Sequence, residues 1–526
     1  MKNIISELEN IRNYKDADTL NHENFPAWTM SDSMRLEQLA MTGSLGNSFY
    51  VSKSALIADA LELLERADAE ELARVIVRGR NEGFIRTFPL LGLVVLSKKS
   101  PQLFQRTFPK VVLTGNDLED FISMTRQMRG FGRSIKRAIH SYLRESVTPY
   151  YAMKYRRQIA DAIRISRFDG NDPLYAYALG AYSRVKGLDA NKIKEVYSAY
   201  SEFEARKTFL ELLEAGKMVE AANVLVKNRL DVDSLSAYYH KFDKIIWTAV
   251  AEITPVMRFL KYLAKFAREG VDVRKFAIKK LTVDSLKAAK VFPFRLYSAY
   301  EAIPSNLEFS QSDTLWGKLT NFTFDVENKS QTIEDILENV LDDYTLEYDW
   351  EEFNDYSWVI APDMSGSMMS RIAGSKLTFS EVSGMFTGFF SKGLNQVRIL
   401  PWNTMVLPYG IEKHASVIEQ IEYLQNSVCG GTYMEVAVDY MLKNRIKTDY
   451  TIFITDSMEY GQGWLASWKQ YRRFNPNAKA FLLRLDCYST QPMSDEDAKK
   501  NGIYQIFGWN DNVIEYIRYV IKQNKK

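Results

Sequence analysis

A short polar loop, Asp363-Met364-Ser365-Gly366-Ser367, carries residue types that suit a divalent cation. One carboxylate and two hydroxyls alternate at positions i, i+2 and i+4. Small hard cations such as Mg2+ prefer octahedral oxygen coordination at roughly 2.0–2.1 Å. The apolar residues 357–361 before the loop indicate a buried strand, and a helical segment follows. The spacing therefore favours a metal-binding turn, although the same side chains could instead cap the next helix.

Two later segments supply further oxygen ligands. Thr432 follows the double glycine Gly430-Gly431, and Asp456 follows the apolar residues 450–455. If the strands are parallel, their carboxyl ends share the edge where open α/β sheets place ligands. We therefore predict a site for Mg2+ or another divalent cation. Its expected ligands are Asp363, Ser365, Ser367, Thr432 and Asp456.

This pattern resembles the metal-ion-dependent adhesion site of von Willebrand factor A domains. The resemblance implies that the two serines and the threonine bind the metal directly, while the aspartates act through water. It also implies one open position for the carboxylate of a protein partner or another anion. Glu459 is close enough in sequence to occupy that position in a resting state.

Strands and helices alternate in the last third of the chain. The expected strands cover residues 357–362, 397–402, 450–455, 480–485 and 503–507. The expected helices cover residues 376–392, 415–426, 434–444 and 512–523. This alternation predicts a mostly parallel sheet with both faces covered. Residues 334–355 hold ten acids and no basic residue, which indicates a solvated helix and connector.

Residues from about 50 to 305 predict one helix after another. Apolar residues recur at helical spacing in six segments. These are residues 54–64, 71–78, 117–128, 131–143, 192–200 and 257–266. Short connections and scarce strand-like alternation favour a helical solenoid. We therefore predict a multidomain protein, with a helical-repeat domain over residues 1–350 and an α/β doubly wound domain over residues 351–526.

Bulk composition places the chain among soluble globular proteins. Its 526 residues are too many for one core, and 46% hydrophobic with 25% charged residues is ordinary. The cysteines Cys429 and Cys487 suggest no disulfide framework, which fits a reducing compartment. The first residues lack the apolar core of a signal peptide. We expect a cytoplasmic protein that does not contact membranes.

Positive charge is concentrated in one segment, although the net charge of the chain is only +2. Residues 121–170 contain eleven Lys and Arg against three acids. A basic block in an otherwise slightly acidic chain indicates a partner that is a polyanion. The candidate RNA-binding residues are Arg129, Arg133, Lys136, Arg137, His140, Arg144, Lys154, Arg156, Arg157, Arg164 and Arg167.

Five of these residues share one face of a predicted helix. From Arg133 to Arg144 the basic side chains recur at offsets 0, 3, 4, 7 and 11, while apolar residues occupy the other face. The second cluster, residues 154–167, lies near Tyr150, Tyr151 and Tyr155. Aromatic rings beside arginines suit stacking on unpaired RNA bases. The alternative is a solvated basic helix with tyrosines in the core.

Several short motifs together resemble the Ro autoantigen family, the TROVE-domain proteins. Residues 132–139, Gly-Arg-Ser-Ile-Lys-Arg-Ala-Ile, resemble a basic helix of that family. Further resemblances lie in residues 48–51, 76–80, 257–263 and 291–294, and the adhesion-type domain follows in the family's order. Two departures stand out. Arg167 occupies the place of a family histidine, and residues 47–50 lack the family's glycine pair.

The resemblance implies HEAT-like helical repeats forming a ring that the von Willebrand factor A domain closes. It implies binding of small noncoding Y RNAs on a basic outer surface. It also implies binding of single-stranded 3′ ends of misfolded or decaying RNAs in the central hole. The RNA of bacterial relatives can tether a 3′-to-5′ exoribonuclease. We expect a monomer that acts in RNA quality control or decay and is not an enzyme.

Two other classes of function compete with this expectation. One is a metal-dependent protein-interaction scaffold without an RNA role, in which the basic block binds an acidic protein. The other is an Mg2+-dependent hydrolase. It is disfavoured because the chain has four histidines and no second carboxylate cluster near Asp363.

Overall fold

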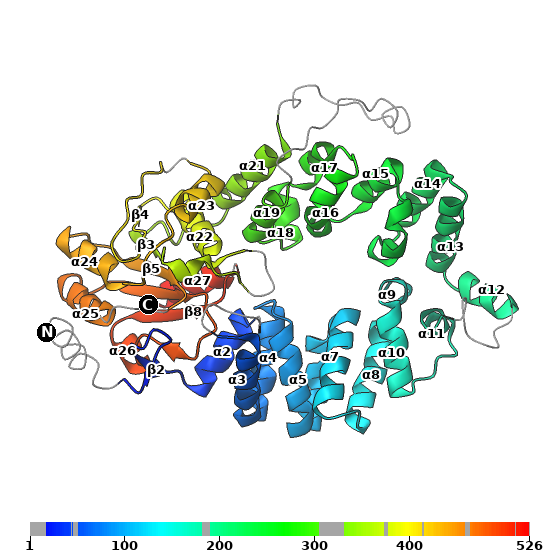
Figure 1. Ribbon diagram of the computed structural model, residues 1–526, viewed down its shortest axis with the longest axis horizontal. Coiled ribbons are helices and arrows are strands. Elements are labelled where there is room, and N and C mark those ends of the chain that lie inside the picture. The colour runs from blue at the N-terminus through cyan, green and yellow to red at the C-terminus, as the bar shows by residue number, and fades with distance from the viewer. Residues whose placement is uncertain are drawn as a thin grey trace. The chain divides into compact units, whose positions relative to one another are not determined.

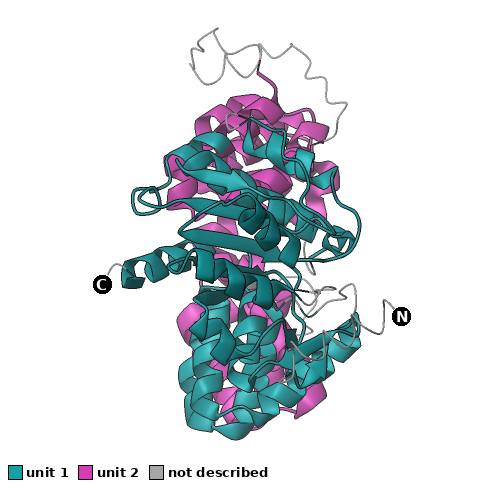
Figure 2. Cartoon of the chain, turned by 90° about the vertical axis from the view of Figure 1, so that its left-hand side faces the viewer, with its two compact units in different colours: residues 1–111, 342–526 teal, residues 112–341 magenta. Residues whose placement is uncertain are grey.

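The computed structural model describes residues 17–43, 45, 51–180, 190–303, 331–372, 377–412, 415–457, 463–510 and 512–524 (Figure 1). The motif residues 48–50 lie outside these ranges, and so does Glu459. The chain forms two compact units, residues 1–111 with 342–526 and residues 112–341 (Figure 2). Across the described ranges, none of the helices has both the length and the apolar character needed to cross a bilayer.

The unit of residues 112–341 is helical, as predicted (Figure 2). Its helices are α7 (Gly115–Met128), α8 (Arg133–Ser146), α9 (Pro149–Lys154), α10 (Arg156–Ser166), α11 (Pro173–Ala178), α12 (Ala190–Ser198), α13 (Ser201–Glu214), α14 (Met218–Asn228), η1 (Asp233–Lys241), α15 (Lys244–Ile253), α16 (Val256–Arg268), α17 (Val273–Lys280), α18 (Val283–Ala288) and α19 (Pro293–Tyr300). Helices adjacent in sequence pack together, for example α13 on α14 and α14 on α15. Repetition of such pairs buries a continuous apolar core.

The other unit begins with two short strands and a group of helices. They are β1 (Thr19–Leu20), β2 (Pro26–Thr29), α2 (Asp32–Thr42), α3 (Lys53–Arg66), α4 (Ala69–Asn81), α5 (Thr87–Lys99) and α6 (Pro101–Val111). Helix α5 is buried from Phe88 to Ser97. A helix that is apolar on all sides must be surrounded by other elements, and α5 packs against α4, α6 and α3.

A five-stranded parallel sheet forms the centre of the α/β domain (Figure 1). Its spatial order is β4 (Val397–Ile399), β3 (Trp358–Pro362), β5 (Tyr450–Thr455), β6 (Lys479–Arg484) and β8 (Ile503–Phe507). Trp358 pairs with Tyr450 and Pro362 with Ile454, so β3 and β5 run in register to the same edge. The parallel sheet and its five strands are therefore confirmed, although β4 ends at Ile399 rather than at residue 402.

Helices cover both faces of this sheet. They are α22 (Phe379–Gly393), α23 (Val417–Gln425), α24 (Glu435–Lys443), α25 (Trp464–Phe474), α26 (Asp495–Lys500) and α27 (Asn512–Asn524), with the short η3 (Gly366–Met369) after β3 and α21 (Ile333–Leu346) before it. Val359 and Ala361 of β3 lie in one buried cluster with Met441 of α24 and Trp468 of α25. Helix α22 packs on β3, β4 and β5.

The N-terminal segment is attached to the α/β domain by contacts that the sequence did not predict. Strand β2 pairs antiparallel with β1 and with β7 (Thr490–Gln491). Gln38 of α2 donates to the carboxylate of Asp486 at 3.2 Å. The Asp486 carboxylate forms a fully buried bidentate pair with Arg484, at 2.9 and 3.1 Å. Helix α2 and the end of β6 therefore share one buried polar network.

Candidate metal centre and basic surface

The loop after β3 turns sharply because its own side chains hold it. The backbone N–H of Ser365 donates to Asp363 Oδ1 at 2.8 Å. The hydroxyl oxygens of Ser365 and Ser367 lie 3.2 Å apart. All three side chains are buried, which places two hydroxyls beside a carboxylate in a site largely shielded from solvent.

Backbone hydrogen bonds bring the two other predicted segments to this loop. Gly366 N–H donates at 3.0 Å to the carbonyl of Gly430, the first residue of the glycine pair that precedes Thr432. Asp363 N–H donates to the carbonyl of Ile454 at 2.9 Å, two residues before Asp456. Thr432 and Asp456 are both buried. The three segments therefore meet at the carboxyl edge of the sheet, as their spacing predicted.

Thr455 is a site residue that sequence reasoning missed. Its hydroxyl donates to Asp363 Oδ2 at 2.6 Å and accepts from the backbone N–H of Ser457 at 3.0 Å. It thereby fixes the orientation of the Asp363 carboxylate. Its position as the last residue of β5, directly before Asp456, is the signal that could have identified it.

The electrostatics of Asp363 favour a cation. Burial raises the pKa of this carboxyl to about 6, against hydrogen bonds from Thr455 and Ser365 that lower it. Among the described residues, no Lys or Arg forms an ion pair with Asp363. An ionised carboxylate in such a place is costly unless a positive charge compensates it. The two carboxylates and three hydroxyls fit the hard oxygen ligands of Mg2+.

Within the described ranges, no group of three or more His, Cys, Asp or Glu gathers to hold a metal ion. The expected donor set differs from such a group, because Asp363 and Asp456 are its only carboxylates and the rest are hydroxyls. Ser365, Ser367 and Thr432 would contact the ion, with both aspartates supplying the negative charge.

Protons are expected to compete with a metal ion at Asp363. Because its pKa is raised to about 6, ionisation of Asp363 in the metal-free protein lowers stability as pH rises through that value. We expect Mg2+ at about 10 mM to raise the melting temperature at about pH 7.5 and much less at about pH 5, where protons occupy the carboxyl. Scanning fluorimetry measures both; equal gains at the two pH values would exclude Asp363 from the site.

Helix α8 presents the first half of the predicted basic surface. Ile135, Ile139 and Leu143 are fully buried, while Arg133 and Arg137 on the opposite face are exposed and Lys136 is half-buried. Within the described part of the chain, none of these three cations has an ion-pair partner. They are available to an external anion.

The remaining basic residues near α8 have more varied surroundings. His140 Nε2 lies 3.1 Å from the carbonyl of Ser166, which holds this ring in a polar contact with the chain. The guanidinium of Arg144 is exposed and lies 5.6 Å from the ring centroid of Phe168. Arg129 is exposed and has internal contacts, whereas Arg167 is exposed without an ion pair in the described residues.

Acidic residues neutralise much of the second basic cluster. Lys154 lies 3.3 Å from Asp233 and 3.8 Å from the buried Asp231, both in or near η1. Arg157 pairs with Glu119, and Arg164 pairs with Asp161 at 3.1 Å. Burial lowers the pKa of the half-buried Arg156. The cations that remain unpaired are therefore concentrated on α8 rather than spread over residues 154–167.

The tyrosines near this cluster are partly structural. Tyr155 is 8% exposed and packs against Gly115, while the Tyr150 hydroxyl donates to Asp231 at 2.9 Å. Tyr150 is 37% exposed, so only part of its ring is available to a base. These two tyrosines therefore leave little ring surface accessible to a ligand.

Comparison with known proteins agrees with this architecture. Residues 357–521 match the family model of the Ro60 vWA domain. The α/β domain of this chain therefore matches the vWA domain of the Ro type. Its fold is similar to the crystal structure of the Ro protein (RSR) of Deinococcus radiodurans, with a TM-score of 0.61 at 19% sequence identity. The match covers 91% of this chain and 97% of the other, so Ro-type architecture extends beyond the vWA domain to the helical region.

Proposed function

We propose that this Ro-type chain binds RNA through the basic face of α8. The observation that carries the proposal is the exposed pair Arg133 and Arg137 with the adjacent Lys136, all without an ion pair in the described residues. Lysine and arginine that neutralise phosphates release condensed counterions, which supplies sequence-independent affinity. A surface whose cations already pair with acids would contribute far less.

The start of α8 supports the same ligand. Gly132 caps this helix and provides no side-chain acceptor for the N–H groups of the first turn. Such groups, at the positive end of a helix dipole, favour a phosphate oxygen. Arg133, Lys136 and Arg137 lie in that turn or just after it, so backbone and side-chain donors are close together.

The family supplies the finer parts of the proposal. The RNA partners would be small noncoding Y-like RNAs on the basic outer surface and single-stranded ends of misfolded or decaying RNA in a central hole. The role would be noncoding RNA quality control or decay, with a 3′-to-5′ exoribonuclease tethered by the RNA. The protein would act as a monomer, in the cytoplasm, by binding rather than by catalysis.

The metal centre has a separate role in this proposal. Mg2+ held by Ser365, Ser367 and Thr432, with Asp363 and Asp456 behind them, would take the carboxylate of a protein partner. The bound ion supplies positive charge and an open coordination position. The burial of all five side chains supports this proposal, because it would shield the ion from solvent.

Replacing Arg133, Lys136 and Arg137 together by Ala tests the RNA surface. Loss of three phosphate contacts is expected to weaken binding of a structured RNA by about 30-fold near physiological salt. A filter-binding or fluorescence titration measures the affinity. The control, Lys443→Ala with Arg473→Ala and Lys499→Ala, removes the same charge from exposed helix positions of the α/β domain. Equal affinity of the α8 variant and the control variant would refute the proposal.

A protein-interaction scaffold is the second candidate, and one observation favours it. Met369 is 54% exposed and Met405 is 61% exposed, on the loops that follow β3 and β4 at the carboxyl edge of the sheet. Apolar side chains beside a metal centre suit a protein partner that combines a carboxylate with apolar neighbours. Absorbance at 260 nm, before and after nuclease treatment of the purified protein, separates this function from RNA binding.

A further inference from the structure

A second segment of the chain has the same excess of basic over acidic residues as residues 121–170, and the proposed function does not use it. Residues 257–296 contain eleven Lys and Arg against three acids, the same balance as residues 121–170. They form α16, α17, α18 and most of α19, all within the unit of residues 112–341. Such a concentration of cations favours an anionic ligand, provided that the structure leaves some of them accessible.

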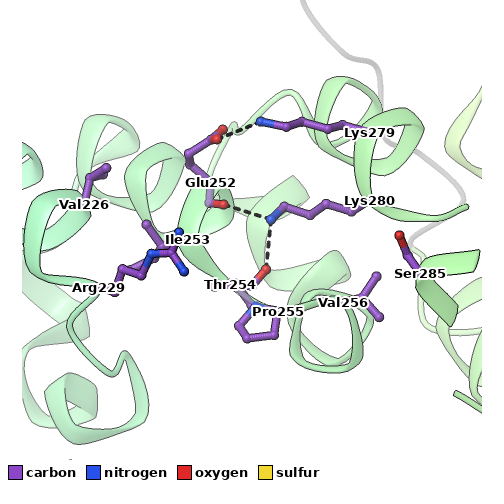
Figure 3. A pocket seen from close by; sticks show the side chains of 10 residues that line it. All are labelled: Val226, Arg229, Glu252, Ile253, Thr254, Pro255, Val256, Lys279, Lys280 and Ser285. Carbon is purple, nitrogen blue, oxygen red and sulfur yellow. Dashed lines mark hydrogen bonds and ion pairs between the residues drawn. The ribbon is translucent and has the colours of Figure 1, made fainter. Parts of the chain in front are cut away.

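A cavity of about 550 Å3 opens beside these helices (Figure 3). It lies where α14 and α15 end, where α16 begins, and where α17 leads into α18. Its lining includes the basic residues Arg229, Lys279 and Lys280, and Glu252 is the acid among the lining residues. The charged side chains around this cavity therefore sum to a net positive charge.

Lys280 is held in a fixed position in this cavity. Its ammonium donates to the carbonyls of Glu252 at 2.8 Å and Thr254 at 2.9 Å, at the end of α15 (Figure 3). An ammonium carries three N–H donors, so one more remains for a ligand. Lys279 lies on the same helix and pairs with the Glu252 carboxylate at 2.9 Å. That pair is more than one-third exposed on each side and is weak enough to open.

The start of α16 adds backbone donors at the same place. Pro255 caps this helix, and no side chain accepts from its first N–H groups. Thr254, Pro255 and Val256 all line the cavity. The positive end of the α16 dipole thus lies at the cavity wall, next to Lys280, which its hydrogen bonds to the carbonyls of Glu252 and Thr254 hold in place.

Arg229 completes the cationic lining. It follows α14 in the left-handed conformation, with φ of 47°. This conformation is unfavourable for a residue with a side chain, and glycine usually occupies it at a helix end. The Arg229 side chain is exposed, and no described residue forms an ion pair with it. A guanidinium here offers a planar set of donors that suits a phosphate.

We propose that this cavity binds a phosphate group, with Arg229, Lys280 and the start of α16 as its donors. The phosphate could belong to a nucleic acid strand or to a free mononucleotide, since both present the same oxygens. The site is distinct from the basic face of α8 and does not depend on it.

Titration of the full chain with inorganic phosphate, followed by calorimetry, tests this site. Arg229→Gln is expected to weaken phosphate binding about tenfold, because a charge-assisted contact is lost. Arg229→Gly should weaken it equally without loss of stability, because glycine tolerates the left-handed conformation. Arg268→Gln, which removes an exposed arginine of α16 outside the cavity, should leave the affinity unchanged.

Glu252→Gln is expected to raise the affinity for phosphate, whereas Arg229→Gln lowers it. Removing the acid releases Lys279 and raises the positive charge of the cavity, so phosphate should bind about threefold more tightly. A purely structural role of these residues would not strengthen binding. No measurable phosphate binding by the parent protein, or equal affinities of the parent, Arg229→Gln and Glu252→Gln, would overturn the site.

Competition identifies the source of the phosphate. A short single strand without terminal phosphates displaces inorganic phosphate if the cavity takes an internal phosphodiester. Only a mononucleotide displaces it if the cavity takes a terminal phosphate. Either result supports the site. Because these titrations use no structured RNA, their failure would leave the α8 surface unaffected, and the triple α8 variant should retain full phosphate binding.

Discussion

Asp363→Ala is expected to lower Mg2+ affinity by more than about 100-fold, since loss of even an outer-shell partner costs about 10–100-fold at a metal site. Asp363 is buried, accepts from both Thr455 and Ser365, and holds the loop that carries the serines. Its removal takes away negative charge and the organisation of the turn together. Calorimetric titration with Mg2+ measures the effect.

Asp439→Ala is the matched control for this metal experiment. It removes an exposed carboxylate from α24 of the same domain, and Mg2+ affinity should not change. RNA affinity of Asp363→Ala should equal that of the parent, because α8 belongs to the other compact unit. Unchanged Mg2+ affinity in Asp363→Ala would remove this residue from the metal centre.

Asp486→Ala is expected to destabilise the unit of residues 1–111 and 342–526 by about 3–5 kcal/mol, the cost of leaving one member of a buried ion pair alone. Arg484 is fully buried, and Asp486 also accepts from Gln38 of α2 and from the Tyr488 backbone. The variant thus loses the hydrogen bond from the Gln38 side chain of α2 to the Asp486 carboxylate. Urea unfolding followed by tryptophan fluorescence reports mainly on this unit, because seven of the nine tryptophans of the chain lie in it.

The double variant Arg484→Met with Asp486→Ala separates charge from packing. Removing both charges leaves no uncompensated ion, so the double variant should be more stable than Asp486→Ala alone. Lys500→Ala, which removes an exposed partner of Glu496 in α26, should leave the free energy of unfolding nearly unchanged. Equal stability of Asp486→Ala and the parent protein would mean that this network does not hold α2 to the domain.

The meeting of the Asp363 loop with the segment before Asp456 could be predicted because the information for it is local. The strand before Asp363 and the strand before Asp456 are apolar runs that end in a carboxylate. Parallel strands bring such ends to one edge of the sheet, so the sequence pattern predicts that they meet without any knowledge of distances between atoms. Helices α25 and α26 were missed. Neither helix carries a residue of the predicted metal site, although Trp464 and Trp468 of α25 contribute to the core of the same domain.

The basic surface was harder to predict because ion pairs are not local. The periodicity of α8 identified its exposed face correctly, since burial alternates with the helical repeat. Lys154 had the same charge, but its partners Asp231 and Asp233 lie far along the chain. The pairing of β2 with β7 and the contact of Gln38 with Asp486 were inaccessible for the same reason.

Photo-crosslinking tests most directly whether α8 contacts RNA. Thiouridine-substituted structured RNA would be bound to the full chain, irradiated and digested, and the crosslinked peptides sequenced by mass spectrometry. The expected crosslinks lie in the peptides that contain Arg133, Lys136 and Arg137, and they should disappear in the triple Ala variant. Strong crosslinks confined to other segments, with none in α8, would contradict the proposed RNA surface.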